Sequence, residues 1–373
     1  HVEGPTQAQW NNLSAADMNL AQQALDAGNF GRAEELLTAH QPSAEAEDLR
    51  GFEWFHYRRL VRGDSAEILR GHEQLVSALA LGRDGRHLFS AGFDGTIREW
   101  SVPAWKETRR WARPGAQFLD LALSPAGDQL AVEDGQHNIF GLLDLAAGTW
   151  TTRVSPAAPA VQFAPDGREL ARGLGLFLFE TNAVVEIIDS TLQPRRILPE
   201  SGGRAWFSPN GRLLVTGSWG HALKLWSWPA LEFLGELPDA GVILSAAFSP
   251  DGTRLATSAR DGRLQLWDLA GRRKTREVRT HRNEAIWSIV FSPDGTWLAS
   301  AGNDQTVRVW EIGDLAERRV FRGHGSEVWS VLWTADGRQF ISAGKDTTIR
   351  VWDFMTEAAP LEIANLDQPP AFS

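Results

Sequence analysis

The chain has 373 residues, and its 37 Lys and Arg against 47 Asp and Glu give a formal net charge of −10. This acidic balance disfavours nucleic acid and anionic membrane surfaces as partners, and the absence of Cys excludes disulfides, thiolate metal sites and cysteine nucleophiles. No stretch approaches about 18 uninterrupted apolar residues, so we expect no direct membrane insertion by this chain.

Residues 1–64 are predicted to form a helical N-terminal segment. The chain begins at His1 with neither Met nor a signal segment, so we expect a processed or excised piece of a longer protein. A second helix with Leu36 and Leu37 is expected between a break at Gly28-Asn29 and Pro42, and a third, rich in aromatic residues, from Ala46 to about Val61. The first helix is expected to bury an apolar stripe at helical spacing, formed by Leu13, Ala16, Leu20 and Ala24.

A turn resembling Ser-Pro-Asp-Gly recurs along the rest of the chain. Its seven copies occupy residues 82–85, 124–127, 164–167, 208–211, 249–252, 292–295 and 334–337. In five copies a Trp closes an alternating strand 15 residues after the turn Gly, and these are Trp100, Trp226, Trp267, Trp310 and Trp352. Leu142 and Ile188 take this place in the second and third copies. The intervals of 38 to 46 residues match a four-stranded blade, and the longest marks an insertion around Leu174–Val185.

These repeats predict an all-β fold, a seven-bladed propeller over residues 65–355 with a C-terminal tail at 356–373. One blade cannot bury both of its faces, so the blades must pack radially and the ring must close. We expect Glu67–Leu69 to form the outermost strand of the blade that ends at Trp352, because the sequence before His72 parallels that before His324. Closure by the tail at Leu361–Ala364 is the alternative.

Five of the copies resemble WD repeats. Gly71-His72, Thr280-His281 and Gly323-His324 precede their first strands, and Trp267-Asp268 and Trp352-Asp353 end two of them. The second and third copies lack the His, the Trp and the Asp of this pattern. The resemblance implies a chain of hydrogen bonds from Asp through His and Ser to Trp in three copies. These tetrads are His72, Ser90, Asp94 and Trp100; His281, Ser300, Asp304 and Trp310; and His324, Ser342, Asp346 and Trp352.

The same residue types could be read as a hydrolytic triad. A nucleophilic Ser must be exposed beside an oxyanion site, whereas these Ser lie inside alternating apolar strands and recur from blade to blade. We therefore interpret the tetrads as structural and expect no catalytic residue.

The resemblance also implies that a protein or peptide binds the face where the turns and the mouths of the inner strands meet. The residues before the turn Asp or in its place are Phe93, Trp219, Arg260, Asn303 and Lys345. The residues at the strand mouths are Ser77, Leu244, Trp287 and Trp329. Trp and Arg are enriched at binding hot spots, and strand alternation turns the two Trp away from the core face. The alternative is that the aromatic residues only cap the channel.

Residues 18–37 and 49–54 resemble the connector that precedes WD repeats in large bacterial Ser/Thr protein kinases. The resemblance implies an upstream kinase domain and membrane helix in the parent protein, and a sensing or docking role in signalling for this chain on the extracytoplasmic side. Without that link we expect a cytoplasmic location. No Gly-rich loop with a Val-Ala-Ile-Lys strand and no His-Arg-Asp loop occurs, so no kinase activity is expected here.

We expect a non-catalytic protein-interaction scaffold without a cofactor. The nine His are scattered, so no metal site is predicted. One alternative is an enzyme that uses the central channel, which requires convergent His, Asp and Glu, and another is a permanent structural subunit with a broad apolar surface. The basic run at residues 272–279 is interpreted as a solvated edge strand, with an acidic-partner site as its alternative.

Overall fold

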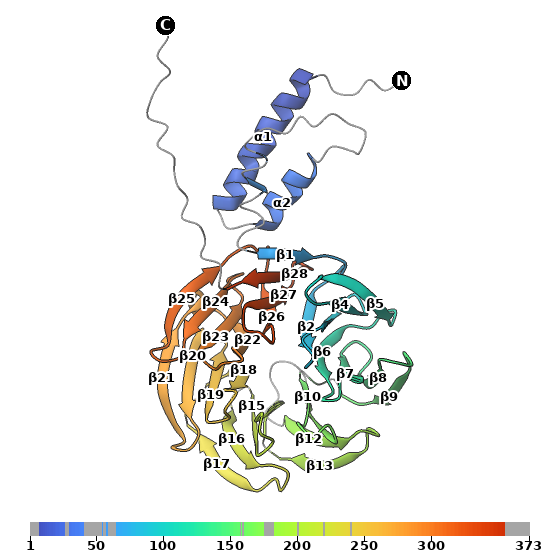
Figure 1. The fold of residues 1–373 in the computed structure, drawn as a ribbon, viewed down its shortest axis with the longest axis vertical. Helices are drawn as coiled ribbons and strands as arrows, with labels where there is room; N and C mark the ends of the chain where they lie inside the picture. Colours follow the sequence, from blue (N-terminus) through green and yellow to red (C-terminus); the bar gives the residue numbers. More distant parts are fainter. Residues whose placement is uncertain are drawn as a thin grey trace.

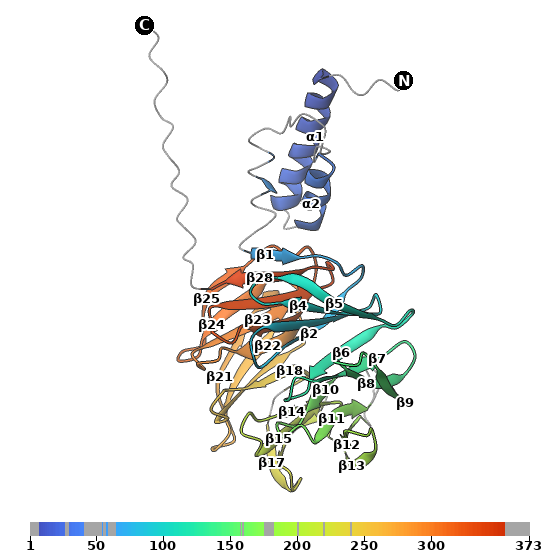
Figure 2. The ribbon, with the colours of Figure 1, turned by 45° about the vertical axis from the view of Figure 1, so that its right-hand side comes forward.

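The computed structural model describes residues 7–26, 30–40, 54, 57–58, 65–156, 158, 160–174, 183–199, 201–218, 221–238 and 241–354. Two helices, α1 (Gln7–Asp26) and α2 (Phe30–Thr38), precede seven four-stranded antiparallel sheets. The sheets are arranged radially in a ring, and the helices lie outside the ring next to β1 (Figures 1 and 2). The prediction of a seven-bladed propeller with a short helical segment is confirmed.

The first four blades follow the chain in order, each running from its innermost to its outermost strand. Blade one consists of β2 (Val76–Leu81), β3 (His87–Gly92), β4 (Thr96–Ser101) and β5 (Lys106–Ala112). Blade two consists of β6 (Phe118–Leu123), β7 (Gln129–Asp134), β8 (Ile139–Asp144) and β9 (Trp150–Val154). Blade three consists of β10 (Val161–Phe163), β11 (Glu169–Leu174), β12 (Val184–Asp189) and β13 (Pro194–Leu198). Blade four consists of β14 (Arg204–Phe207), β15 (Leu213–Ser218), β16 (His221–Ser227) and β17 (Phe233–Leu237).

The last three blades continue this order, and the ring is completed by a strand from the start of the propeller. Blade five consists of β18 (Ile243–Phe248), β19 (Arg254–Ala259), β20 (Arg263–Asp268) and β21 (Arg273–Arg279), and a short 3-10 helix, η1 (His281–Asn283), follows it. Blade six consists of β22 (Ile286–Phe291), β23 (Trp297–Gly302), β24 (Val307–Glu311) and β25 (Ala316–Phe321). Blade seven consists of β26 (Val328–Trp333), β27 (Gln339–Gly344), β28 (Ile349–Asp353) and, from the start of the propeller, β1 (Ser65–Leu69).

Strand β1 closes the ring. It pairs antiparallel with β28, with Glu67 opposite Val351 and Leu69 opposite Ile349. The innermost strands contact their neighbours in sequence around the channel, and β26 of blade seven contacts β2 of blade one. The prediction that Glu67–Leu69 completes the blade that ends at Trp352 is therefore confirmed, and residues 361–364 lie outside the described residues.

The recurring turn has the hydrogen bonds and the backbone conformation that its residue types favour. In blade five the Ser249 hydroxyl donates to Asp251 Oδ1, the Arg254 N–H donates to Ser249 Oγ over 3.0 Å, and Gly252 takes a φ of 69°. Only residues that tolerate a left-handed backbone suit the last position, which explains the repeated Gly. The basic run forms β21, whose residues are mostly exposed on the outer edge of blade five, as the edge-strand interpretation expects.

The apolar face of α1 differs from the predicted stripe. Ala16 and Leu20 are exposed, Leu20 to 46%, whereas Met18 and Ala21 are buried. The reason is that α1 packs on α2 and on Trp54, whose indole N–H donates to the Leu37 carbonyl, so the buried face follows Met18, Ala21 and Ala24. Gly28-Asn29, Pro42 and most of the predicted third helix lie outside the described residues. Within the described ranges, neither helix combines the length and the hydropathy that a membrane span requires.

Candidate functional site

Three blades contain the same chain of four hydrogen-bonded side chains. In blade one, Trp100 Nε1 donates to Ser90 Oγ over 2.9 Å, Ser90 Oγ lies 2.8 Å from His72 Nε2, and His72 Nδ1 lies 2.9 Å from Asp94 Oδ2. Blades six and seven repeat this geometry with distances of 2.7 to 2.9 Å, through Trp310, Ser300, His281 and Asp304, and through Trp352, Ser342, His324 and Asp346.

In the tetrad of blade seven, burial and hydrogen bonding indicate the direction of each hydrogen bond. Burial opposes ionisation of Asp346, but hydrogen bonds from His324 and the Gly325 N–H, together with the charge of Arg350, outweigh it and hold the pKa of Asp346 below its ordinary value. Burial lowers the pKa of His324. A neutral His324 then donates from Nδ1 to Asp346 and accepts the Ser342 hydroxyl at Nε2, which leaves the Ser342 oxygen to accept the indole N–H.

The tetrad serines have no access to a substrate. Ser90, Ser300 and Ser342 are 0% exposed, and each hydroxyl is already engaged by a His and a Trp. Acyl transfer requires an accessible hydroxyl beside an oxyanion site, so the geometry of these groups fits a structural network rather than a hydrolytic triad.

Two further blades retain a shortened version of the network that sequence reasoning missed. In blade four the Trp226 indole N–H donates to Thr216 Oγ1 over 2.9 Å, and in blade five Trp267 donates to Thr257 Oγ1 over the same distance. Thr replaces the Ser, and among the described side chains no His completes the chain. The signal was present in the sequence, because each Thr lies ten residues before its Trp, as Ser90 does before Trp100.

Blades two and three are joined by a buried ion network instead of a tetrad. The Arg172 guanidinium is 0% exposed and donates to both Glu133 oxygens over 2.7 and 3.0 Å. It also reaches Glu186 Oε2 at 3.3 Å, to which Arg153 donates over 2.6 Å. Burial raises the pKa of Glu133, and the hydrogen bonds and charge of Arg172 act in the opposite direction. Sequence reasoning did not single out any of these four residues.

A repeated β-bulge places two of the predicted partner-binding residues, Trp287 and Trp329, at the mouth of the channel. In blades six and seven the register shifts between Ile286 and Ser288 and between Val328 and Ser330, so Trp287 and Trp329 are the extra residues. A bulge re-aims its extra side chain, and here both indoles are partly exposed at the mouth of the channel.

The loops before the turn Asp lie on the same face as these bulges. The N–H groups of Phe93, Asn303 and Lys345 donate to Leu75, Ala285 and Glu327, the residues that directly precede the inner strands. Each such bond is 2.9 Å long and ties a loop of one blade to the mouth of its own inner strand. In these three blades the loop before the turn Asp therefore lies beside the start of the inner strand.

Phe93, Trp287 and Trp329 form a continuous cluster, here called the aromatic rim. The two indoles stack with centroids 5.0 Å apart, and Phe93 meets Trp329 edge-on at 6.1 Å. Polar neighbours hold the rings in place: Trp287 Nε1 donates to Asn303 Oδ1, and Trp329 Nε1 donates to Glu327 Oε2 over 3.1 Å. The blades that contribute the three rings are blades one, six and seven.

Lys345 and Glu327 complete the edge of the rim. Lys345 Nζ lies 3.2 Å from Glu327 Oε1, so one carboxylate bridges the ammonium group and the Trp329 indole. Sequence reasoning identified Lys345 but missed Glu327. Glu327 stands immediately before a buried strand residue and two residues before Trp329, so only the bulge geometry shows that the two side chains meet.

The other predicted positions do not join this cluster. Ser77 and Leu244 are buried, to 7% and 1% exposure, so the expectation that they stand open at the strand mouths is wrong. Ser77 is turned towards the next blade because its hydroxyl donates to the Phe118 carbonyl there over 2.6 Å. Arg260 is exposed on the corresponding loop of blade five, and Trp219 lies outside the described residues.

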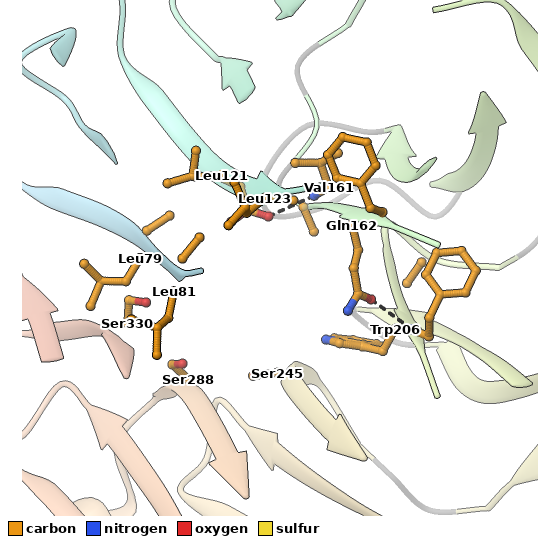
Figure 3. Close-up of a pocket in the computed structure, with 18 of the residues that line it drawn as sticks. Leu79, Leu81, Leu121, Leu123, Val161, Gln162, Trp206, Ser245, Ser288 and Ser330 are labelled. Carbon is orange, nitrogen blue, oxygen red and sulfur yellow. Dashed lines mark hydrogen bonds between the residues drawn. The ribbon is translucent and has the colours of Figure 1, made fainter. Parts of the chain in front are cut away.

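The rim opens into a central channel of about 650 Å³. Trp287 and Trp329 line it together with the residues that follow them, Ser288 and Ser330. Figure 3 shows Ser245, Ser288 and Ser330 on one side of this channel and Val161, Gln162 and Trp206 across from them. In the part of the chain that the structure describes, no group of three or more His, Asp or Glu is placed to hold a metal ion.

Comparison with known proteins supports the repeat assignment. Five segments match the family described as WD domain, G-beta repeat, at residues 63–101, 204–227, 232–268, 272–311 and 316–353. The unmatched stretch between residues 101 and 204 holds blades two and three, where the ion network replaces the tetrad. The chain therefore carries WD40 repeats on a seven-bladed propeller.

Several curated proteins share part of this sequence. The chain is 26% identical over 202 residues to Periodic tryptophan protein 2 of Arabidopsis thaliana, which covers 53% of this chain and 18% of that protein. It is 29% identical to the Caenorhabditis elegans homolog, over 56% of this chain and 20% of that protein. It is 25% identical to Cell division cycle 20.5, cofactor of APC complex, of Arabidopsis thaliana, over 57% of this chain and 40% of that protein. The chain thus spans less than half the length of each relative.

Proposed function

We propose that this WD40-repeat propeller is a non-catalytic docking platform that binds a protein or peptide on the aromatic rim. The observation that carries the proposal is the contact of three partly exposed aromatic side chains, Phe93, Trp287 and Trp329, at the mouth of the channel. Clustered Trp and other aromatic residues that a partner can desolvate contribute a large share of the binding free energy at protein interfaces.

The rim is held in shape before a partner arrives. Asn303 and Glu327 accept the indole N–H groups of Trp287 and Trp329, so binding need not fix these rings. Ordering a free side chain at an interface costs about 0.5–1.5 kcal/mol, a cost that a pre-ordered ring largely avoids. The polar edge formed by Lys345 and Glu327 gives the rim a charged border that discriminates among partners.

The relatives support a scaffold rather than an enzyme. The name of one relative describes a cofactor of the APC complex, a protein that acts within an assembly. We extend only the general role, protein interaction, to this chain. A permanent structural subunit would have the same general role, protein interaction. Its long-lived interface would bury a larger surface area than the aromatic rim alone.

The link to an upstream bacterial Ser/Thr kinase and to signalling stays a prediction. The relatives described above come from eukaryotes, and none of their names describes a kinase. The prediction rests on the N-terminal resemblance alone, and detection of a kinase domain upstream of His1 in the complete gene would test it.

A comparative capture experiment tests the docking proposal. The intact chain, Trp329→Ala and a control, Trp111→Ala, are immobilised, and retained proteins are quantified by mass spectrometry. Trp111 is a partly exposed Trp on the outer strand β5, away from the rim. A partner of the rim is retained by the parent and by the control but lost with Trp329→Ala.

The affinity for the partner so identified is then measured directly. Loss of a central aromatic residue is expected to cost about 2 kcal/mol or more, roughly a thirtyfold increase in Kd. If every retained protein binds Trp329→Ala as tightly as it binds the parent, the rim is not the docking surface.

A further inference from the structure

One layer of the channel, just inside the aromatic rim, is unusually polar. The position four residues before each recurring turn contributes one side chain per blade to this layer. In blade order these residues are Ala78, Asp120, Ala160, Arg204, Ser245, Ser288 and Ser330, and all of them line the channel. A layer that served only to fill the centre of the ring would be apolar, so the polar residues require an explanation.

Arg204 is the cation of this layer and makes no hydrogen bond or ion pair through its side chain with any described residue. The charge of Asp120 acts on it, yet the two side chains form no hydrogen bond or ion pair with each other. The Asp120 carboxylate instead accepts the Val161 N–H of the next blade over 2.8 Å. The guanidinium therefore presents donors to the channel that the described part of the chain does not satisfy.

The serines of the layer offer further donors. Neither the Ser245 nor the Ser330 side-chain hydroxyl has a hydrogen-bond partner among the described residues. Ser288 Oγ accepts the Val331 N–H over 3.2 Å, which leaves its own proton free to donate. One guanidinium and three hydroxyl groups thus face a channel of about 650 Å³, a size typical of small-ligand sites.

We propose that this layer binds a carboxylate, with Arg204 as its charge partner and the hydroxyls of Ser245, Ser288 and Ser330 as additional donors. A planar carboxylate matches the fork of a guanidinium. A phosphate dianion fits less well, because the layer holds a single cation and the nearby Asp120 repels a second negative charge. The carboxylate can belong to an acidic side chain inserted from a partner or to a free small acid.

This inference does not depend on the proposed docking function. The rim supplies apolar contacts at the mouth, whereas the layer supplies charge and donors inside the channel. Loss of carboxylate binding would leave the docking proposal intact, and loss of partner capture by Trp329→Ala would leave the carboxylate site intact.

The test uses two matched probes of the intact chain. N-acetyl-glutamate amide carries one side-chain carboxylate, and N-acetyl-glutamine amide has the same shape without the charge. Binding is followed by NMR through the indole N–H resonance of Trp206, which lines the channel and is assigned with Trp206→Phe. Acetate serves as the probe for a free small acid.

We expect the glutamate probe to shift the Trp206 resonance saturably and the glutamine probe to leave it unchanged. Arg204→Gln should weaken the affinity about tenfold or more, as expected for loss of a charged hydrogen-bond partner. The control is Arg196→Gln on the exposed outer strand β13, which should bind like the parent. If Arg204→Gln fails to fold, Asp120→Asn provides the second test, because removal of the repelling charge should tighten binding.

The arms also separate the two sources of the carboxylate. Tighter binding of the glutamate probe than of acetate supports an inserted side chain, and equal binding supports a free acid. The proposal is overturned if neither acid shifts the resonance, if the glutamine probe binds as well as the glutamate probe, or if Arg204→Gln binds like the parent. A response to inorganic phosphate alone would overturn the assignment to carboxylates.

Discussion

At the scale of single residues, the tetrads show how one buried carboxylate supports several groups. Asp346 Oδ2 accepts from His324 Nδ1 and from the Gly325 N–H over 2.9 and 2.8 Å, while Oδ1 accepts from Thr348. Asp304 plays the same part for His281 and also binds Arg308. The carboxylate therefore fixes both a loop and a ring, and none of these hydrogen bonds reaches the three aromatic side chains of the rim.

Removal of either carboxylate is expected to lower stability and leave partner selectivity unchanged. Asp304→Ala and Asp346→Ala should each reduce the free energy of unfolding by about 1–3 kcal/mol, because they leave buried donors without an acceptor. Urea denaturation measures the loss, with Glu232→Ala, an exposed site, as the control. A variant that unfolds like the parent but captures no partner would contradict the structural assignment.

The tetrads also predict a loss of stability at acidic pH. The folded chain holds the pKa of His324 below its ordinary value, so protons bind preferentially to the unfolded chain as the pH falls below about 6.5. The pKa values of Asp94, Asp304 and Asp346 are lowered too. Their contribution is present above the ordinary Asp value, near pH 4, and is lost as the pH falls through the folded values.

Urea midpoints at pH 7, 5 and 3 test this dependence. Between pH 7 and 5 the raised pKa values of Glu133 and Asp120 act against the effect of His324, so the tetrads are tested between pH 5 and 3, where the free energy of unfolding should decrease. Asp346→Asn should be less stable at pH 7 but should show a shallower decline below pH 4, because one of the responsible carboxylates is gone. A free energy of unfolding that stays constant or rises from pH 5 to 3 would refute the role of these groups.

At the scale of elements, the sequence predicted the strands correctly where a residue type has a single local structural role. The recurring turn and the closing Trp placed the blades, since Pro and Gly set the backbone and each Trp ends a third strand. The parallel between the segments before His72 and His324 identified the closing strand β1. Such signals are local, so periodicity and turn chemistry reveal them.

Features that depend on distant partners escaped prediction. Arg172 and Glu133 are 39 positions apart and belong to different blades, so neither residue looked unusual in its own strand. The buried face of α1 was misplaced because its partner, α2 with Trp54, selects Met18 and Ala21 rather than the larger Leu20. The bulges that seat Trp287 and Trp329 are likewise a property of strand pairing.

The ion network between blades two and three makes a distinct stability prediction. Arg172→Met should cost about 3–5 kcal/mol, because it leaves Glu133 buried without its partner. The double variant Glu133→Met with Arg172→Met should recover most of that loss, since a buried ion pair is often no more stabilising than apolar residues of similar size.

Thermal and urea unfolding of the parent, both single variants and the double variant form a mutant cycle that measures the coupling. Glu186 keeps Arg153 as a partner in every member of the set, so the cycle isolates the Glu133–Arg172 pair. Losses that simply add in the double variant would show that the two side chains do not act as a pair.

At the scale of the whole molecule, stability depends on closure of the ring by β1. Leu69 is 4% exposed and packs with Val76 of blade one and Ile349 and Val351 of blade seven, so one short strand joins the first and last blades. Without it, the backbone groups of β28 form an open edge, and open edges invite pairing with other chains. A ring that lacks β1 therefore loses apolar burial and gains an aggregation-prone edge.

Two truncations separate this effect from that of the helices. Deletion of residues 1–69 removes α1, α2 and β1, whereas deletion of residues 1–40 removes both helices and keeps β1. We expect the longer deletion to lower the free energy of unfolding by more than about 2 kcal/mol, the scale of one buried Leu side chain, and to associate with rising concentration. The shorter deletion should stay monodisperse and melt close to the parent. Thermal melting and light scattering over a concentration series provide the measurement, and identical behaviour of the two truncations would mean that β1 does not secure the ring.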